Sequence, residues 1–340
     1  MKMTQREYDL RFHTPAFLGN ADQSGQWRTP PFKAQLRQWW RVAYAASKSF
    51  SLNEARMREE EGELFGNAWL DDGFSKSLVR IRLEQWSEGK LKSWDGNDPT
   101  VRHDNVPKPV GSQLYMGYGP LVFRGGTALK ANAAVQAGEQ NTFSIAYPGE
   151  HAPLIEQALA LMNQFGTVGG RSRNGWGSYS LQGIHELCHL PVRAWREAFA
   201  LDWPHAVGGD AEGALVWQTS AFDEWKALMK DLAAIKIQLR TQFVLTTGKN
   251  SPRTEDRHWL SYPVTNHSVA AWGNNARLPN SLRFKVRPTA DGKLVGVIFH
   301  MPCLPPAAFR PETKAITAVW QKVHAFLDNQ DQAKLARIGA

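Results

Sequence analysis

The sequence predicts an α+β protein built on a ferredoxin-like plan, and three observations indicate this class. Stretches in which apolar and polar residues alternate are typical of half-buried strands, and they occur at 8–12, 77–83, 114–123, 142–147 and 178–181. Stretches with helical periodicity separate them, at 32–47, 53–65 and 153–165. With insertions, these elements follow the order strand, helix, strand, strand, helix, strand, which is the ferredoxin-like order.

The first helix carries a basic stripe. It opens at Pro30 and Pro31, where the missing proline N–H costs nothing. Apolar residues form one broad face, namely Phe32, Leu36, Trp39, Trp40 and Ala43. Lys33, Arg37 and Arg41 follow at i, i+4 and i+8, so they lie along one side of the helix.

The second half of the chain matches the same plan less completely. Helices are expected at 191–200, 221–242 and 312–328, and strands at 282–287 and 294–301. The boundary falls near 183–190, which divides the chain into 1–185 and 186–340.

Composition narrows the possible partners. The 340 residues are 42% hydrophobic with a formal net charge of +8, so the chain can bury a core and favours polyanions such as nucleic acid. No apolar run of about 18 residues is present, so no membrane span is expected. The first residues lack the apolar core of a signal peptide, and the expected location is the cytoplasm. Two distant cysteines, Cys188 and Cys303, exclude a disulfide framework and a multi-cysteine zinc site.

A glycine-rich loop, GTVGGRSRNGWGSYSL at 166–181, follows the helix predicted at 153–165. Its glycines permit positive φ and close backbone approach, and its amides can line an anion-binding concavity. Its arginines add fork-shaped donors for phosphate and its tryptophan a stacking face. The candidate RNA-binding residues here are Gly169, Gly170, Arg171, Ser172, Arg173, Asn174 and Trp176. A plain helix-to-strand connector is the alternative, but it would need one or two glycines rather than five.

Other candidate RNA-binding residues lie outside this loop. They are Arg28, Lys33, Arg37, Trp40, Arg41, Arg124, Lys130 and Arg277. No acidic residue occurs between Arg28 and Ser49, so the stripe on the first helix has few local partners and can neutralise phosphates. Arg283 and Lys285 share one face of the strand at 282–287, and a solvated strand face is the simpler interpretation there.

Residues suited to catalysis or metal binding are sparse. Asp71 and Asp72 are adjacent, which is typical of a turn rather than a metal pair. His185 and His189 have i, i+4 spacing, but Pro191 follows closely and no H-E-x-x-H motif is present. Neither a P-loop nor a G-x-S-x-G motif occurs. We therefore expect no catalytic residue, no metal and no cofactor.

Several of these segments, taken in order, resemble the first RAMP subunit of the Cmr (type III-B CRISPR) effector complex. The similarity is carried by FHTPAFLGNADQ at 12–23, RTPPFKAQLRQWWR at 28–41, EGELFG at 61–66, GGRSRNGWG at 169–177 and RLPNSLRFKV at 277–286. Asn20 and Ala34 stand where that family usually has glycine. The match covers most of the chain, with gaps at 84–140 and 190–260.

The resemblance implies two ferredoxin-like (RRM-like, RAMP) domains in tandem, the second more degenerate. It also implies a subunit that binds RNA without cutting it, in antiviral defence. The implied partners are the CRISPR guide RNA, a single-stranded target RNA and the other Cmr subunits. We expect the stripe and the glycine loop to contact the RNA backbone from two sides of a cleft, while guide–target pairing selects the sequence.

Two alternatives stay open. One is a metal-independent RNA-processing endoribonuclease of the same superfamily, for which His13 is the acid–base candidate. The other is a purely structural assembly subunit whose basic faces meet acidic neighbours.

Overall fold

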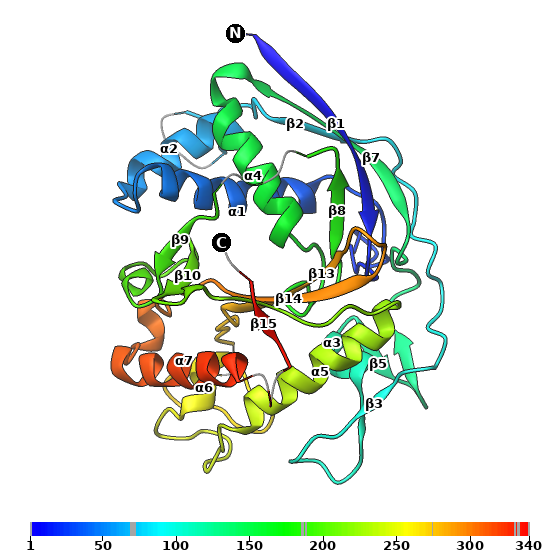
Figure 1. Ribbon diagram of the computed structural model, residues 1–340, viewed down its shortest axis with the longest axis vertical. Coiled ribbons are helices and arrows are strands. Elements are labelled where there is room, and N and C mark those ends of the chain that lie inside the picture. The colour runs from blue at the N-terminus through cyan, green and yellow to red at the C-terminus, as the bar shows by residue number, and fades with distance from the viewer. Residues whose placement is uncertain are drawn as a thin grey trace.

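The first sheet has the strand order of a ferredoxin-like domain. The computed structural model describes residues 2–68, 73–184, 187, 189–273, 275–329, 331 and 334–338. In it, β1 (Met3–Phe12) pairs with β7 (Gln140–Pro148) on one side and β8 (Tyr179–Gln182) on the other, and β2 (Arg80–Leu83) pairs with β7. The antiparallel order β2–β7–β1–β8, with α1 (Pro30–Ser47) after β1 and α4 (Ala152–Phe165) after β7, confirms the predicted plan (Figure 1).

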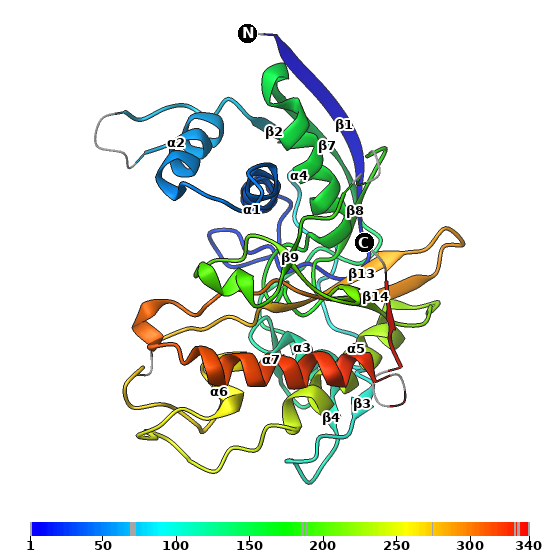
Figure 2. The same ribbon diagram turned by 60° about the vertical axis from the view of Figure 1, so that its left-hand side comes forward.

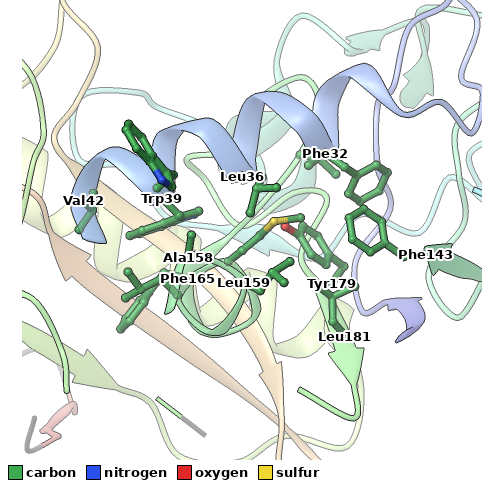
Figure 3. Close-up of a cluster of buried hydrophobic side chains, with 14 of the residues drawn as sticks. Phe32, Leu36, Trp39, Val42, Phe143, Ala158, Leu159, Phe165, Tyr179 and Leu181 are labelled. Carbon is green, nitrogen blue, oxygen red and sulfur yellow. The ribbon is translucent and has the colours of Figure 1, made fainter. Parts of the chain in front are cut away.

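The apolar face predicted for α1 is buried. Phe32, Leu36 and Trp39 are each 0% exposed. Figure 3 shows this face directed at side chains of α4 and of β8, including Phe165 and Tyr179. Burial of each large side chain contributes about 1.5–3 kcal/mol, which fixes the rotation of α1 and so the side on which its basic stripe lies. The next helix, α2 (Glu54–Phe65), packs against α1.

A second sheet repeats the same order. It contains β12 (Val216–Gln218), β13 (Leu282–Pro288), β14 (Leu294–His300) and β15 (Ala336–Arg337), in the antiparallel order β13–β14–β12–β15. In the chain, α5 (Trp225–Thr241) and α6 (Asp256–Leu260) lie between β12 and β13, and α7 (Thr313–Asp328) lies between β14 and β15. Two β-α-β-β-α-β units therefore follow one another, and the tandem ferredoxin-like architecture is confirmed.

The two faces of the second sheet contact different layers. Phe299 of β14 packs on Trp39 and Phe165, with ring centroids 6.4 and 4.8 Å apart. The neighbouring Ile298 belongs instead to the hydrophobic cluster formed with α5 and α7. The order of layers is thus first sheet, α1 with α4, second sheet, then α5 with α7, as Figure 2 also shows.

Short elements fill the insertions and connections. β3 (Thr100–Val101) pairs with β4 (Val110–Gly111), and β5 (Leu121–Phe123) pairs with β6 (Thr127–Leu129). The strand predicted at 114–123 is wrong over α3 (Ser112–Gly117). Here the Asp98 carboxylate accepts from the N–H groups of Gln113 at 2.7 Å and Leu114 at 2.9 Å, which caps the first turn of a helix.

The helix predicted at 191–200 is also wrong. β9 (Val192–Ala194) pairs in parallel with β10 (Val207–Asp210), which in turn pairs with β11 (Gly213–Ala214). At β9, pairing with β10 further along the chain overrides the local helical pattern.

The 3-10 turns are η1 (Gly149–His151), η2 (Glu197–Ala200) and η3 (Ala307–Phe309).

Some of the sequence-based expectations concern Asp71, Asp72, His185 and Cys188, which lie outside the described residues. Of the helices that the structure describes, none is long and apolar enough to cross a bilayer.

Candidate nucleic-acid interface

A buried carboxylate partly neutralises the basic stripe of α1. The Glu61 side chain, on α2, is 2% exposed and lies between two arginines of the stripe. Its Oε1 accepts from Arg37 Nε at 3.0 Å and from Arg41 Nε at 2.9 Å, and its Oε2 accepts from Arg41 Nη2 at 2.9 Å. The expectation that these arginines have few partners is therefore wrong, because their partner comes from the next helix.

Lys33 carries the most available charge of the stripe. It forms no ion pair with any residue that the structure describes. Partial burial and the nearby Arg37 guanidinium lower the pKa of its ammonium group. Arg28, in the loop before α1, donates from Nη1 to the carbonyl oxygen of Gly19.

Contacts from both halves of the fold hold the glycine loop. The carbonyl oxygen of Arg173 accepts from the N–H of Phe284, on β13, at 3.0 Å. The N–H of Gly177 donates to the carbonyl oxygen of Pro15 at 2.9 Å. A Cβ at Gly177 would lie 1.9 Å from the carbonyl oxygen of Val168, so glycine is required there. The loop is therefore a fixed part of the joint between the two sheets.

The tip of this loop leaves successive N–H groups without a protein acceptor. Within the described ranges, the backbone N–H groups of Arg171, Ser172 and Arg173 form no hydrogen bond. Gly169 has φ +91° and Arg171 has φ +56°, and such left-handed residues make neighbouring N–H groups converge on a concavity suited to anions. A Cβ at Gly169 would lie 2.7 Å from the carbonyl oxygen of Phe17, so the close approach needs glycine. This arrangement can hold a phosphate oxygen.

Asn174, in contrast, uses both ends of its amide inside the protein. Its Nδ2 donates to the carbonyl oxygen of Met116 at 2.7 Å, and its Oδ1 accepts from Lys236 Nζ at 2.6 Å. Its side chain therefore positions the loop through both its nitrogen and its oxygen.

The two tryptophans proposed as RNA contacts are core residues. Trp176 is 0% exposed and packs on Phe17 and Trp225, with centroid distances of 5.3 and 5.8 Å. Trp40 is 1% exposed and packs on Phe65 at 5.8 Å. Neither ring offers a face to a base, so the expectation that Trp40 and Trp176 contact RNA is wrong, because tertiary packing covers both rings.

The basic face of β13 is not solvated, which corrects the interpretation from sequence. Lys285 is 0% exposed, and its Nζ donates to the carbonyl oxygen of Asn163 at 2.6 Å. Arg283 is 8% exposed, and burial together with the nearby Arg173 lowers the pKa of its guanidinium to about 9. The face is covered because α1 and α4 pack on this side of the second sheet. Arg277, before β13, is exposed.

One contact links α1 to the strand that holds the loop. The amide oxygen of Gln38, in the orientation that satisfies both partners, accepts from Arg283 Nη2 at 3.0 Å. Because Phe284 of the same strand binds Arg173, the helix of the stripe and the glycine loop meet at β13.

Two exposed aromatic residues were not expected from the sequence, and one of them, Tyr118, contacts the glycine loop. Arg171 Nε donates to the carbonyl oxygen of Tyr118 at 2.6 Å, and the Tyr118 side chain is 64% exposed. Phe123, at the end of β5, is 70% exposed, and the candidates Arg124 and Lys130 are exposed on the same β5–β6 segment. The sequence feature that could have indicated them is the presence of single large apolar residues in the Gly-rich, polar stretch around them.

His13 is buried enough to be neutral at pH 7. Its Nε2 lies 2.8 Å from Ser180 Oγ. Burial, reinforced by Lys285 and Arg11, lowers the pKa of the imidazole to about 4. In the part of the chain that the structure describes, no group of three or more His, Cys, Asp or Glu side chains could hold a metal ion.

Comparison with protein families gives a match to the model of the RAMP superfamily over residues 9–180. The chain belongs to the RAMP superfamily. The matched stretch begins within β1 and ends within β8, so the α1 stripe and nearly all of the glycine loop lie inside the RAMP region. The second sheet of this RAMP protein lies outside the match but repeats its strand order.

Two solved structures resemble this RAMP protein over nearly its whole length. Cmr1 from Pyrococcus furiosus, in its apo form, has 16% sequence identity and a TM-score of 0.46, with 96% of this chain and 98% of that chain covered. The type III-B Cmr-beta complex bound to cognate target RNA contains a chain with 9% identity and a TM-score of 0.48, with 96% and 99% covered. A comparison with curated proteins gives no match.

Replacing Glu61 should destabilise the fold. In Glu61→Gln, a neutral amide replaces the buried carboxylate that accepts from Arg37 and Arg41, so both guanidinium groups lose their counter-charge. We expect the free energy of unfolding to fall by about 2 kcal/mol, which is less than for a fully buried ion pair because both arginines are partly exposed. Urea unfolding measures this free energy. Glu63→Gln, an exposed residue of the same helix, is the matched control, and equal stabilities of the two variants would contradict the role of Glu61.

Proposed function

We propose that this RAMP protein binds single-stranded RNA through the RNA backbone, as a subunit of a type III-B CRISPR (Cmr) ribonucleoprotein effector in antiviral defence. The tip of the glycine loop carries the proposal. It places unpaired N–H groups next to two arginines, with exposed aromatic side chains alongside. Successive amides and guanidinium groups suit phosphate, and aromatic faces suit unstacked bases.

In this mechanism each contact has a separate task. The amides at Arg171, Ser172 and Arg173 hold one phosphate, and Lys33 neutralises another from α1. Tyr118 and Phe123 stack on bases without reading their edges. Because none of these contacts distinguishes one base from another, sequence would be selected by guide–target pairing.

The partners follow from the sequence motifs described above, which resemble the first RAMP subunit of Cmr complexes. We propose that the chain contacts the guide RNA or its single-stranded target, together with other Cmr subunits, in the cytoplasm. We also propose the division into an N-terminal RAMP domain at 1–185 and a C-terminal domain at 186–340.

The salt dependence of RNA binding tests this proposal. The double variant Lys33→Gln with Arg171→Gln removes two cations that neutralise phosphates and keeps the backbone amides of the loop. The slope of log K against log salt should become shallower by about 1.4, since each contact on a single strand contributes about 0.7. Fluorescence anisotropy of labelled single-stranded RNA with the isolated protein measures it.

The matched control for that experiment is Lys314→Gln with Arg82→Gln, two exposed cations on α7 and β2. It should keep the wild-type slope. If the Lys33 and Arg171 variant also keeps the slope, the basic faces meet protein neighbours and the chain is a structural subunit.

The exposed aromatics should contribute affinity without changing the salt slope. Tyr118→Ala and Phe123→Ala each remove a stacking face, which costs about 1–3 kcal/mol of binding for each stacked base. The same anisotropy titration measures both affinity and slope. Phe74→Ala, which removes a 90% exposed aromatic elsewhere, serves as control. Unchanged affinity in both loop variants would remove these residues from the interface.

We further propose that the chain does not cut RNA. Acid–base cleavage needs a proton donor as well as an acceptor, and the neutral His13 has only Ser180 as a side-chain hydrogen-bond partner among the described residues. Guide-precursor RNA incubated with the protein and a chelator should stay intact, equally for wild type and His13→Ala, on a denaturing gel. Cleavage by the wild type that His13→Ala abolishes would instead support the endoribonuclease alternative.

A further inference from the structure

A cluster of basic side chains lies behind the glycine loop, on the side of α5. Lys236 and Arg240 occupy positions i and i+4 of α5, so they share a face of that helix. Arg257, on α6, and Arg171, at the tip of the loop, complete the cationic cluster. Lys236 is 7% exposed and Arg257 is 8% exposed, which is rare for charged residues without an opposite charge.

The protein supplies this cationic cluster with no counter-charge. Among the residues that the structure describes, no carboxylate lies within 4.0 Å of any of the four side chains. Lys236 donates to a neutral acceptor, Asn174 Oδ1, and Arg171 donates to a backbone carbonyl. The guanidinium groups of Arg240 and Arg257 form no hydrogen bond in the described ranges, and the Nε atom of each is buried without a partner.

Electrostatic repulsion acts within the cluster. Burial lowers the pKa of Lys236, and the neighbouring Arg240 and Arg171 lower it further. Burial also lowers the pKa of Arg257, with a further contribution from Arg240. Arg240 thus acts electrostatically on each of the other three cations.

Tyr115, on α3, adds a neutral donor to the same place. Its hydroxyl is buried without a hydrogen-bond partner, and Lys236 Nζ lies 5.8 Å from the centre of its ring. His103 packs edge-on against this ring, with ring centroids 5.9 Å apart, and it borders a cavity of about 580 Å³ lined by the 102–109 loop. The carboxylate of Asp104 lies in that loop and is 64% exposed. It lies 3.9 Å from Arg102 and accepts from Thr241 Oγ1, next to Arg240, at 3.5 Å, but it forms no ion pair with the cluster.

Unpaired buried charges and an unsatisfied hydroxyl cost several kcal/mol each, unless something binds there. An anion with more than one acceptor oxygen would satisfy the two arginines, the tyrosine hydroxyl and the lysine together. Phosphate has this chemistry, and guanidinium groups are suited to it. We propose that the cationic cluster of Arg171, Lys236, Arg240 and Arg257, with Tyr115, is a phosphate-binding site separate from the α1 stripe.

The phosphate could come from two sources. It could belong to the RNA that contacts the tip of the glycine loop, since Arg171 is common to both places, and this source rests on the proposed function. It could also be a small phosphate compound that binds alone. The two sources share the recognition chemistry, and the experiment separates them.

Thermal unfolding of the full chain, with and without ligand, tests the site. The variants are Arg240→Met and Arg257→Met, which keep volume and remove charge. Without ligand both should melt at a higher temperature than the wild type, because one of several repelling cations is gone. Pyrophosphate or a short uridine oligonucleotide should raise the melting temperature of the wild type, and this rise should be lost in both variants.

Two further variants control the measurement. Arg257→Lys keeps the charge and should keep most of the ligand-induced rise. Arg82→Gln, on β2, should behave as the wild type. A response to pyrophosphate identifies a small-phosphate site, whereas a response to RNA alone identifies an RNA phosphate.

The site is overturned if neither ligand stabilises the wild type, or if both Met variants keep the full ligand-induced rise. It is also overturned if both variants melt below the wild type while responding normally, as residues of purely structural role would. RNA binding that depends on Lys33 but not on Arg240 or Arg257 would leave the proposed function intact and remove this site alone.

Discussion

The arrangement of the molecule depends on one buried lysine. Lys285 Nζ, on β13, donates to the carbonyl oxygen of Asn163 near the C-terminal end of α4, where unpaired carbonyls and the helix dipole favour a cation. The same strand binds the glycine loop through Phe284 and meets α1 through Arg283. The packing of the second sheet on α4 therefore determines the position of the glycine loop relative to α1. That position determines the geometry of the whole candidate interface.

The basic residues of this chain divide into two classes that net charge does not distinguish. Arg37 and Arg41 are held by Glu61, and Lys285 donates to backbone carbonyls, so these side chains are engaged inside the fold. Arg171, Lys236, Arg240 and Arg257, near the glycine loop, have no carboxylate within 4.0 Å in the described part of the chain. A surplus of positive charge becomes informative about ligands only after the internally paired groups have been set aside.

Local pattern predicted the first sheet, the face of α1 and the position of the loop, because each depends on periodicity or on glycine content. It failed where a distant segment decides the outcome. The alternation of apolar and basic residues along β13 suggested one buried face and one solvent-exposed face. Helices cover both sides of the second sheet, however, so Lys285 is as buried as Phe284. Glu61 and Asp98 act on segments far from them in sequence, and no spacing rule connects these residues to their partners.

A loop with five glycines would usually be costly to order, since glycine loses more backbone freedom than any other residue. Here the hydrogen bonds from β13 and from Pro15 impose that ordering when the chain folds, long before any ligand arrives. A ligand meeting the loop therefore encounters a surface already in its final shape, and little of the binding free energy is spent on rearranging it. The glycines allow backbone segments to approach one another closely. The flexibility that they would give to an isolated peptide is absent from the folded protein.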